Sequence, residues 1–230
     1  MRLSYILVVL IILASIALSL YFYPQLPDQL VSHWNSNFQP DGTLDKAIGL
    51  AICPVILVML GGLFMLFPRI DPLKSNVEKF RGDFEYFVVL ILAFLLFLHL
   101  LVILWNLGYQ LDFALLLPLW FCAIIYSAGT LCKRARRNWF VGMRTPWAMS
   151  SDTVWVKTNV RGGQMLQGAG LLMLLGLLSS TLFFIILLLS MVFVGIYTIT
   201  YSYREYQKEL KSGKAKPAKK PVKSAKKAKR

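Results

Sequence analysis

Apolar residues in this chain form long blocks that are separated by short polar segments. Blocks at 3–23, 47–67, 84–105 and 111–132 each reach the ~20 residues that a helix needs to cross a hydrocarbon core of roughly 30 Å. Backbone groups inside a bilayer must bond within their own segment or in a closed barrel. The pattern therefore predicts an all-α integral membrane protein.

A further apolar block, from 165 to 203, is too long for a single span. As one helix it would extend about 58 Å at ~1.5 Å per residue, nearly twice the thickness of the hydrocarbon core. We therefore predict two helices that separate near Ser179, Ser180 and Thr181.

Lys and Arg indicate which loops face the cytoplasm. They concentrate in segments 69–81 and 133–161, whereas segment 106–110 contains none. Basic loops stay on the cytoplasmic side, so these two segments are predicted inside, and segments 24–46 and 106–110 outside. Six spans place both termini in the cytoplasm, while five would require the basic C-terminal end to be translocated. We predict a multi-pass protein of the cytoplasmic membrane with six transmembrane helices.

The first block follows Arg2 and is similar to a signal peptide. Its apolar core is too long for one and no A-x-A cleavage site follows, so we expect an uncleaved anchor. The predicted order is a transmembrane helix at 1–23, an extracytoplasmic loop at 24–46, helices two to four within 47–132, a basic cytoplasmic loop at 133–163, helices five and six within 164–203, and a disordered Lys-rich cytoplasmic tail at 204–230.

The formal net charge of +14 is concentrated at the end of the chain, where ten of the 25 Lys and Arg lie in the last twenty residues. Such a tail is expected to contact anionic lipid. It has no aromatic residue on which bases could stack, so it does not favour specific nucleic-acid binding. The three cysteines show neither CxxC nor Cys/His spacing, and we predict no metal site and no cofactor.

Two segments between the apolar blocks carry distinctive motifs. The outer loop contains Leu26-Pro27-Asp28-Gln29-Leu30-Val31-Ser32-His33-Trp34-Asn35, and then Gln39-Pro40-Asp41-Gly42. The inner segment contains Arg137-Asn138-Trp139-Phe140-Val141-Gly142-Met143-Arg144-Thr145-Pro146-Trp147, and then Ser150-Ser151-Asp152-Thr153-Val154-Trp155-Val156-Lys157-Thr158-Asn159. In this order, and on opposite sides of the membrane, the two motifs resemble those of the SdpI family of bacterial membrane proteins.

The resemblance covers most of the chain and implies a function. The best-known members are immunity proteins that protect a cell from a secreted, membrane-active peptide toxin, and some also tether a transcriptional repressor. An extracellular peptide toxin and a cytoplasmic transcriptional regulator are thus the implied partners, besides membrane lipids. Three residues depart from the family pattern: Val31 replaces Pro, Asn37 replaces Gly, and Asn159 replaces a frequent His. We expect Asn37 to preserve the turn because Asn tolerates the left-handed conformation, whereas no proton or metal role can operate at Asn159.

The outer loop supplies the candidate residues for ligand or toxin binding, which are Asp28, His33, Trp34, Asn35 and Asp41. Trp34 suits the bilayer interface. His33 lies near two carboxylates in sequence and can either sense pH or receive a cationic peptide. The alternative is a structural histidine that holds the loop through hydrogen bonds.

The inner segment supplies the candidate residues for partner docking, which are Asn138, Phe140, Gly142, Arg144, Thr145, Pro146, Trp147, Ser151 and Trp155. Ser150 or Ser151 followed by Asp152 predicts a helix start. We expect a short interfacial helix on the cytoplasmic face, which either only anchors the loop or also docks a partner. Trp139, Trp147 and Trp155 are expected at headgroup level, with Arg144 and Lys157 reaching lipid phosphates or Asp152.

His99 is the intramembrane ionisable residue of the third helix, and such residues are candidate functional sites. It either bonds a neighbouring helix or belongs to a proton or substrate pathway. A small-molecule or peptide transporter is therefore the alternative to an immunity protein. An enzyme is not predicted, because no helix carries paired carboxylates, HExxH, or a nucleophile with a base. Close helix contacts are expected at Gly61, Gly62, Gly129, Gly168, Gly170 and Gly176.

Overall fold

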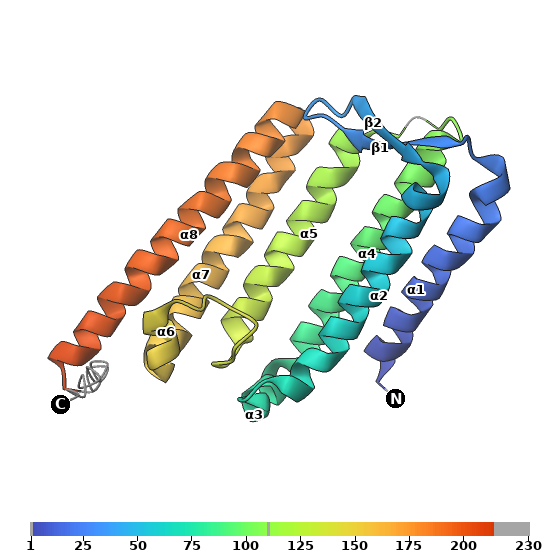
Figure 1. Ribbon diagram of the computed structural model, residues 1–230. Coiled ribbons are helices and arrows are strands. Elements are labelled where there is room, and N and C mark those ends of the chain that lie inside the picture. Colours follow the sequence, from blue (N-terminus) through green and yellow to red (C-terminus); the bar gives the residue numbers. More distant parts are fainter. Residues whose placement is uncertain (1, 110, 214–230) are drawn as a thin grey trace, which may run out of the picture.

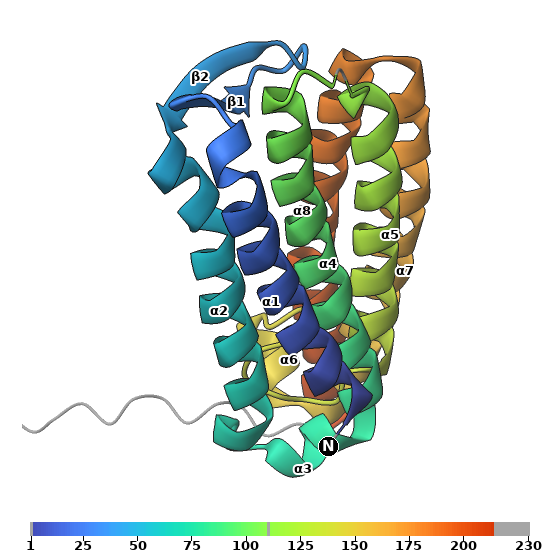
Figure 2. The ribbon, with the colours of Figure 1, turned by 90° about the vertical axis from the view of Figure 1, so that its right-hand side faces the viewer.

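The apolar blocks form helices that lie side by side along one axis (Figures 1 and 2). The structure is a computed structural model that describes residues 2–109 and 111–213. Its long helices are α1 (Leu3–Phe22), α2 (Lys46–Ile70), α4 (Arg81–Asn106), α5 (Phe113–Arg134), α7 (Asp152–Leu172) and α8 (Ser180–Lys211). Shorter elements are the strands β1 (Gln29–Trp34) and β2 (Pro40–Asp45), the helices α3 (Lys74–Val77) and α6 (Pro146–Ser150), and the 3-10 turns Tyr23–Gln25, Glu78–Phe80 and Met173–Leu178.

Five helices in the described part of the chain are long and apolar enough to cross a membrane, and they include every long helix except α7. The first half of α7 contains Asp152, Lys157, Asn159 and Arg161, which lower its hydropathy. A mainly helical membrane protein is thus confirmed. The predicted separation of the last apolar block is also confirmed, because Ser179 is extended, with φ of −169°, between the 3-10 turn and α8.

The residues expected to form a separate interfacial helix are instead the first turns of α7. Ser151 caps this helix by accepting a hydrogen bond from the backbone N–H of Val154, so the helix starts where the sequence predicts. It then continues without a break to Leu172, so residues 152–163 of the segment expected to be a loop are helical. Packing explains the difference, because α7 lies along α5 for much of its length (Figure 1).

Glycines allow α5 and α7 to approach closely. A Cβ atom added to Gly129 would lie 2.5 Å from the carbonyl oxygen of Gly163, and one added to Gly170 would lie 2.7 Å from the backbone nitrogen of Tyr126. Small residues at such contacts let helix backbones pack tightly in membranes. Of the predicted contact glycines, Gly62 and Gly168 instead face open space. The remaining ones, Gly61, Gly129, Gly170 and Gly176, meet neighbouring atoms at 3.1 Å or less.

The outer loop contains a β-hairpin, which the all-α prediction did not include. Strands β1 and β2 pair antiparallel, with Leu30 opposite Leu44 and Val31 opposite Thr43, and the register shifts around His33. The hairpin covers one end of the bundle, which we call the hairpin end (Figure 1). The start of α1, together with α3, α6 and the end of α8, lies at the opposite end, which we call the basic end (Figures 1 and 2).

Charge separates the two ends. Among the described residues, Lys46 is the sole Lys or Arg at the hairpin end, and the others lie toward the basic end. The α8 helix runs to Lys211, so the segment predicted as a tail from residue 204 begins as helix. The remainder of the predicted Lys-rich tail, residues 214–230, lies outside the described residues.

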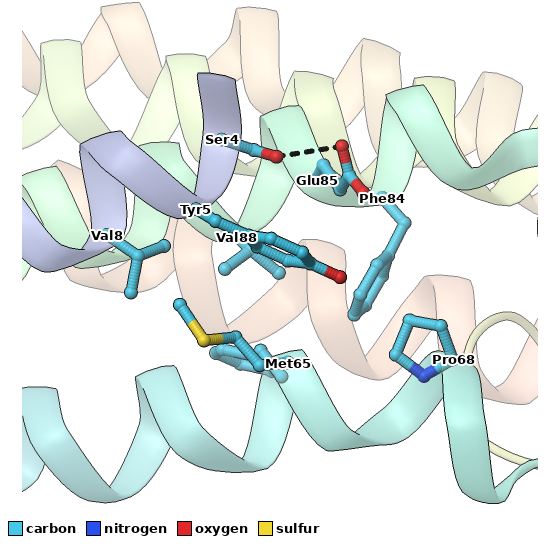
Figure 3. Close-up of a pocket in the computed structure, with 9 residues that line it drawn as sticks. Ser4, Tyr5, Val8, Met65, Pro68, Phe84, Glu85 and Val88 are labelled. Atoms are coloured by element: carbon cyan, nitrogen blue, oxygen red, sulfur yellow. Dashed lines mark hydrogen bonds between the residues drawn. The ribbon is translucent and has the colours of Figure 1, made fainter. Parts of the chain in front are cut away.

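The bundle is closely packed on the side formed by α1, α2 and α4. Leu57, Phe67, Phe84 and Leu92 belong to one buried cluster between these helices. Figure 3 shows a crevice in this region, where the Ser4 hydroxyl donates a hydrogen bond of 2.8 Å to Glu85. Its cavity volume is about 10 Å³, room for roughly one water molecule. This crevice therefore offers no ligand site, and the larger cavities lie elsewhere.

Candidate functional site

A polar side chain at the end of α4 attaches the hairpin to the bundle. The Oδ1 atom of Asn106 accepts a hydrogen bond of 2.8 Å from the backbone N–H of Val31, and its Nδ2 donates one of 2.9 Å to the Val31 carbonyl. Val31 therefore uses the N–H that a proline at this position would lack. Nearby, the Lys46 ammonium lies 3.0 Å from the Asp28 carboxylate and donates to the carbonyl of Leu26.

His33 pairs with Asp41 across the two strands. Its Nδ1 lies 2.5 Å from the Asp41 Oδ1, and both side chains are exposed. A hydrogen bond that holds the loop, one of the roles expected for His33, is thus present. The other predicted carboxylate, Asp28, pairs with Lys46. No group of three or more His, Cys, Asp or Glu that could hold a metal occurs among residues 2–109 and 111–213.

Asn35 closes the turn of the hairpin. Its Oδ1 accepts hydrogen bonds from the backbone N–H groups of Asn37 and Gln39, at 2.9 and 3.1 Å. The left-handed residue is Phe38, with φ of 58°, so the expectation that Asn37 adopts this conformation is wrong. The Asn35 side chain holds the backbone of Asn37, and the reversal falls one residue later. The Phe38 ring consequently points onto the bundle, 6.2 Å from Phe113 and 5.8 Å from Phe184.

An aromatic cavity of about 340 Å³ lies beneath the hairpin. The Trp34 ring packs 5.7 Å from Trp105 and 5.0 Å from Phe113. The cavity is lined by Ser32, His33, Trp34, Asn35, Phe38, Leu98, Leu101, Val102, Phe113, Leu117 and Phe184. The indole N–H of Trp34 is buried and donates to no described residue. Its mostly aromatic and aliphatic lining suits this cavity to an apolar group.

His99 lies next to a second cavity of about 210 Å³. Its Nε2 is 2.9 Å from the Ser19 hydroxyl on α1, which itself donates to the carbonyl of Leu50 on α2. His99 therefore bonds a neighbouring helix, which is one of the two roles expected for it. The side chain is only 3% exposed, and Cys53 lines the same cavity.

At the basic end, the inner motif folds around buried amides. Asn138 is fully buried; its Oδ1 accepts from the backbone N–H groups of Phe140 and Val141, and its Nδ2 donates to two carbonyls of the same loop. The buried carboxylate of Asp71, at the end of α2, accepts from the N–H of Trp139 at 2.9 Å. Asn138 therefore shapes the loop and is not exposed for partner docking, contrary to prediction.

A second set of hydrogen bonds joins the inner motif to α7. The indole of Trp155 donates to the carbonyl of Ala135 at 2.8 Å, and Asn159 accepts from the N–H of Met143 at 2.7 Å. Gly142 adopts a φ of 109°, and a Cβ atom there would lie 2.5 Å from the Asn159 Oδ1. Trp155 is 1% exposed, so it does not face lipid headgroups. Its indole N–H is satisfied by the Ala135 carbonyl and not by a headgroup.

The remaining motif residues cap helices or face outward. Thr145 caps α6 through the N–H of Ala148 and donates to the Ser202 hydroxyl of α8 at 2.8 Å. Among the predicted docking residues, the exposed ones are Phe140, Arg144 and Pro146.

The ion pairs at the basic end differ from those expected. Lys157 pairs with Glu205 at 2.7 Å, and Asp152 pairs with Arg137 at 2.9 Å. Arg144 donates to the carbonyl of Trp139. The sequence analysis missed Asp71, which joins the inner motif to α2, and Asn106, which joins the hairpin to α4. The one feature of the sequence that could have indicated them is their position: Asp71 directly follows an apolar helix, and Asn106 ends one.

These features define a class of protein, a helical membrane protein with a ligand-sized cavity under a hairpin at one end and a folded basic loop at the other. Residues 134–202, which include the whole inner motif, match the SdpI/YfhL protein family. Residues 10–58, which include the hairpin, match a domain of unknown function, DUF1648. The predicted resemblance to the SdpI family is therefore confirmed.

A curated relative extends the similarity along the chain. Immunity protein SdpI from Bacillus subtilis (strain 168) is 24% identical over 202 residues, which cover 88% of this chain and 95% of the relative. No solved structure matches this chain.

Proposed function

We propose that this chain is a membrane immunity protein of the SdpI type, which protects its cell against a secreted, membrane-active peptide toxin by binding it. The observation that carries the proposal is the aromatic cavity beneath the hairpin. The similarity to Immunity protein SdpI over 88% of the chain supports the same function.

The topology that fits this function has six spans, with α7 as the fifth. Positive charge marks the cytoplasmic side, and the basic end carries all but one of the described Lys and Arg. Both termini then lie in the cytoplasm, and the hairpin faces the compartment from which a toxin arrives. The polar first half of α7 is accommodated because Lys157 is paired with Glu205 of α8 and Asn159 is buried in the inner motif.

Binding requires no catalytic step. An apolar side chain of the peptide enters the cavity between Trp34, Phe113 and Phe184. Burial of one large apolar side chain contributes about 1.5–3 kcal/mol. The exposed carboxylates of Asp28 and Asp41 add attraction for a cationic peptide, moderated by their pairing with Lys46 and His33.

The test uses a Bacillus subtilis strain that lacks its own Immunity protein SdpI and is exposed to medium from the toxin-producing parent. A voltage-sensitive dye reports membrane potential in cells that carry wild type, Trp34→Ala, His33→Ala or Leu117→Trp. The last variant fills the cavity and leaves the polar groups of the hairpin in place. We expect the wild type to hold its potential, and Trp34→Ala and Leu117→Trp to lose protection.

Trp139→Ala is the matched control, because this tryptophan is 54% exposed at the basic end and its hydrogen bonds use backbone atoms. The amount of each variant in the membrane fraction shows that it is inserted. Depolarisation of cells that carry inserted wild type would contradict the immunity proposal and favour transport of another ligand. Full protection by Leu117→Trp would contradict the cavity as the binding site.

A further inference from the structure

A second open cavity lies at the basic end, between the inner motif and α8. Its volume is about 590 Å³. We call it the motif groove; it is lined by Gly142, Met143, Arg144, Thr145, Pro146, Trp147, Gly195, Thr198 and Ile199. The wall formed by α8 is apolar, because the hydroxyl of Thr198 donates its hydrogen bond to the carbonyls of Val194 and Gly195 within the helix. A Cβ atom on Gly195 would meet no atom within 4 Å, so this wall is open.

The motif groove continues the apolar outer face of α8. Val192, Ile196 and Ile199 are 50%, 60% and 51% exposed on this helix, as expected for residues that face lipid chains. Toward the end of the helix, Trp147 packs edge-on against Tyr203, with ring centroids 5.1 Å apart. Trp and Tyr gather where hydrocarbon meets headgroups. The groove therefore crosses the boundary between the apolar and polar layers of the membrane.

Arg144 provides a positive charge at the polar end of this groove. At the same end of the bundle, Asp152 is paired with Arg137, and Glu205 is paired with Lys157 and Lys208. Arg144 forms no ion pair within the described part of the chain, and one guanidinium nitrogen donates to the carbonyl of Trp139. A guanidinium has five N–H donors, so others remain for an anion, and its geometry suits phosphate.

We propose that the motif groove binds one anionic phospholipid, with its phosphate on Arg144 and one acyl chain along Gly195 and Ile199. Charge complementarity and the position at the membrane boundary select this occupant, because a lipid alone combines a phosphate with a chain that fits an open apolar wall. The proposal concerns the basic end and does not depend on toxin binding at the hairpin end.

The test measures binding of fluorescent phosphatidylglycerol to the purified full chain in detergent, with phosphatidylcholine and glycerol phosphate as competitors. Arg144→Gln removes the charge, and Gly195→Leu fills the apolar wall. We expect each to weaken phosphatidylglycerol binding roughly tenfold, the scale of one charge-assisted hydrogen bond or one buried side chain. Arg136→Gln, also exposed at the basic end, is the matched control and is expected to bind like wild type.

Equal binding by wild type, Arg144→Gln and Gly195→Leu would overturn the proposal, as would equal competition by glycerol phosphate, which carries no chain. A photo-reactive amino acid in place of Pro146 tests the occupant in cells. We expect an adduct of lipid mass. An adduct of protein mass would overturn the assignment and identify the groove as a protein-docking surface.

Discussion

The side-chain amide of Asn106 bonds both backbone polar groups of Val31, 75 residues away in sequence. This pair ties β1 to the end of α4 and sets the height of Trp34 above the aromatic cavity. We therefore expect the cavity to depend on a polar residue whose side-chain hydrogen bonds, among the described residues, go to the backbones of Val31 and Val102.

Asn106→Ala is expected to loosen the hairpin and reduce protection. The substitution leaves the N–H and carbonyl of Val31 without their partner, a loss of about 1–3 kcal/mol. Thermal unfolding in detergent measures the stability, and the dye assay measures protection. Asn37→Ala is the control, because that side chain is exposed and bonds to no described residue. Equal stability of the two variants would show that the Asn106 pair does not hold the hairpin.

Gly142→Ala is expected to destabilise the inner motif. The φ of 109° disfavours any side chain, and the added Cβ would collide with Asn159 Oδ1. Such strain costs about 1–3 kcal/mol, measured as a lower free energy of unfolding. Gly168→Ala, in the open on α7, should be neutral or slightly stabilising because alanine favours helix. An unfolding curve for Gly142→Ala that overlays wild type would contradict this geometry.

Asp71→Asn is expected to weaken the contact between α2 and the inner motif. The two carboxylate oxygens accept from the N–H groups of Leu73 and Trp139, and an amide would turn one acceptor into a donor. The buried mismatch is expected to cost about 1–3 kcal/mol of unfolding free energy. Asp152→Asn changes an exposed ion pair and is expected to cost at most about 1 kcal/mol. A larger loss of unfolding free energy for Asp152→Asn than for Asp71→Asn would refute the role of Asp71.

The six-span topology predicts where reporters are active. Green fluorescent protein at the C-terminus of the full chain should fluoresce, since it folds in the cytoplasm, whereas alkaline phosphatase there should be inactive. Alkaline phosphatase inserted in the turn at Asn37 should be active. An active phosphatase at the C-terminus would mean an odd number of spans, and α7 would then not cross the membrane.

Much of the architecture follows from local properties of the sequence. Block length and apolar content predict helices α1, α2, α4 and α5, because a span is defined by its own residues. The start of α7 at Ser151 and Asp152 follows from capping chemistry, and the break at Ser179 follows from the limit on helix length. The motifs were sufficient to predict the family resemblance.

Tertiary structure decided what the polar residues do. Asn138 and Trp155 were predicted as docking residues of a basic segment, yet both are buried, because their hydrogen-bond partners lie within the protein. The long α7 helix depends on glycine contacts with α5, and the cavity beneath Trp34 depends on Asn106. Sequence determines how long an apolar segment is, whereas the partner of each polar atom is set only when distant segments come within hydrogen-bond distance.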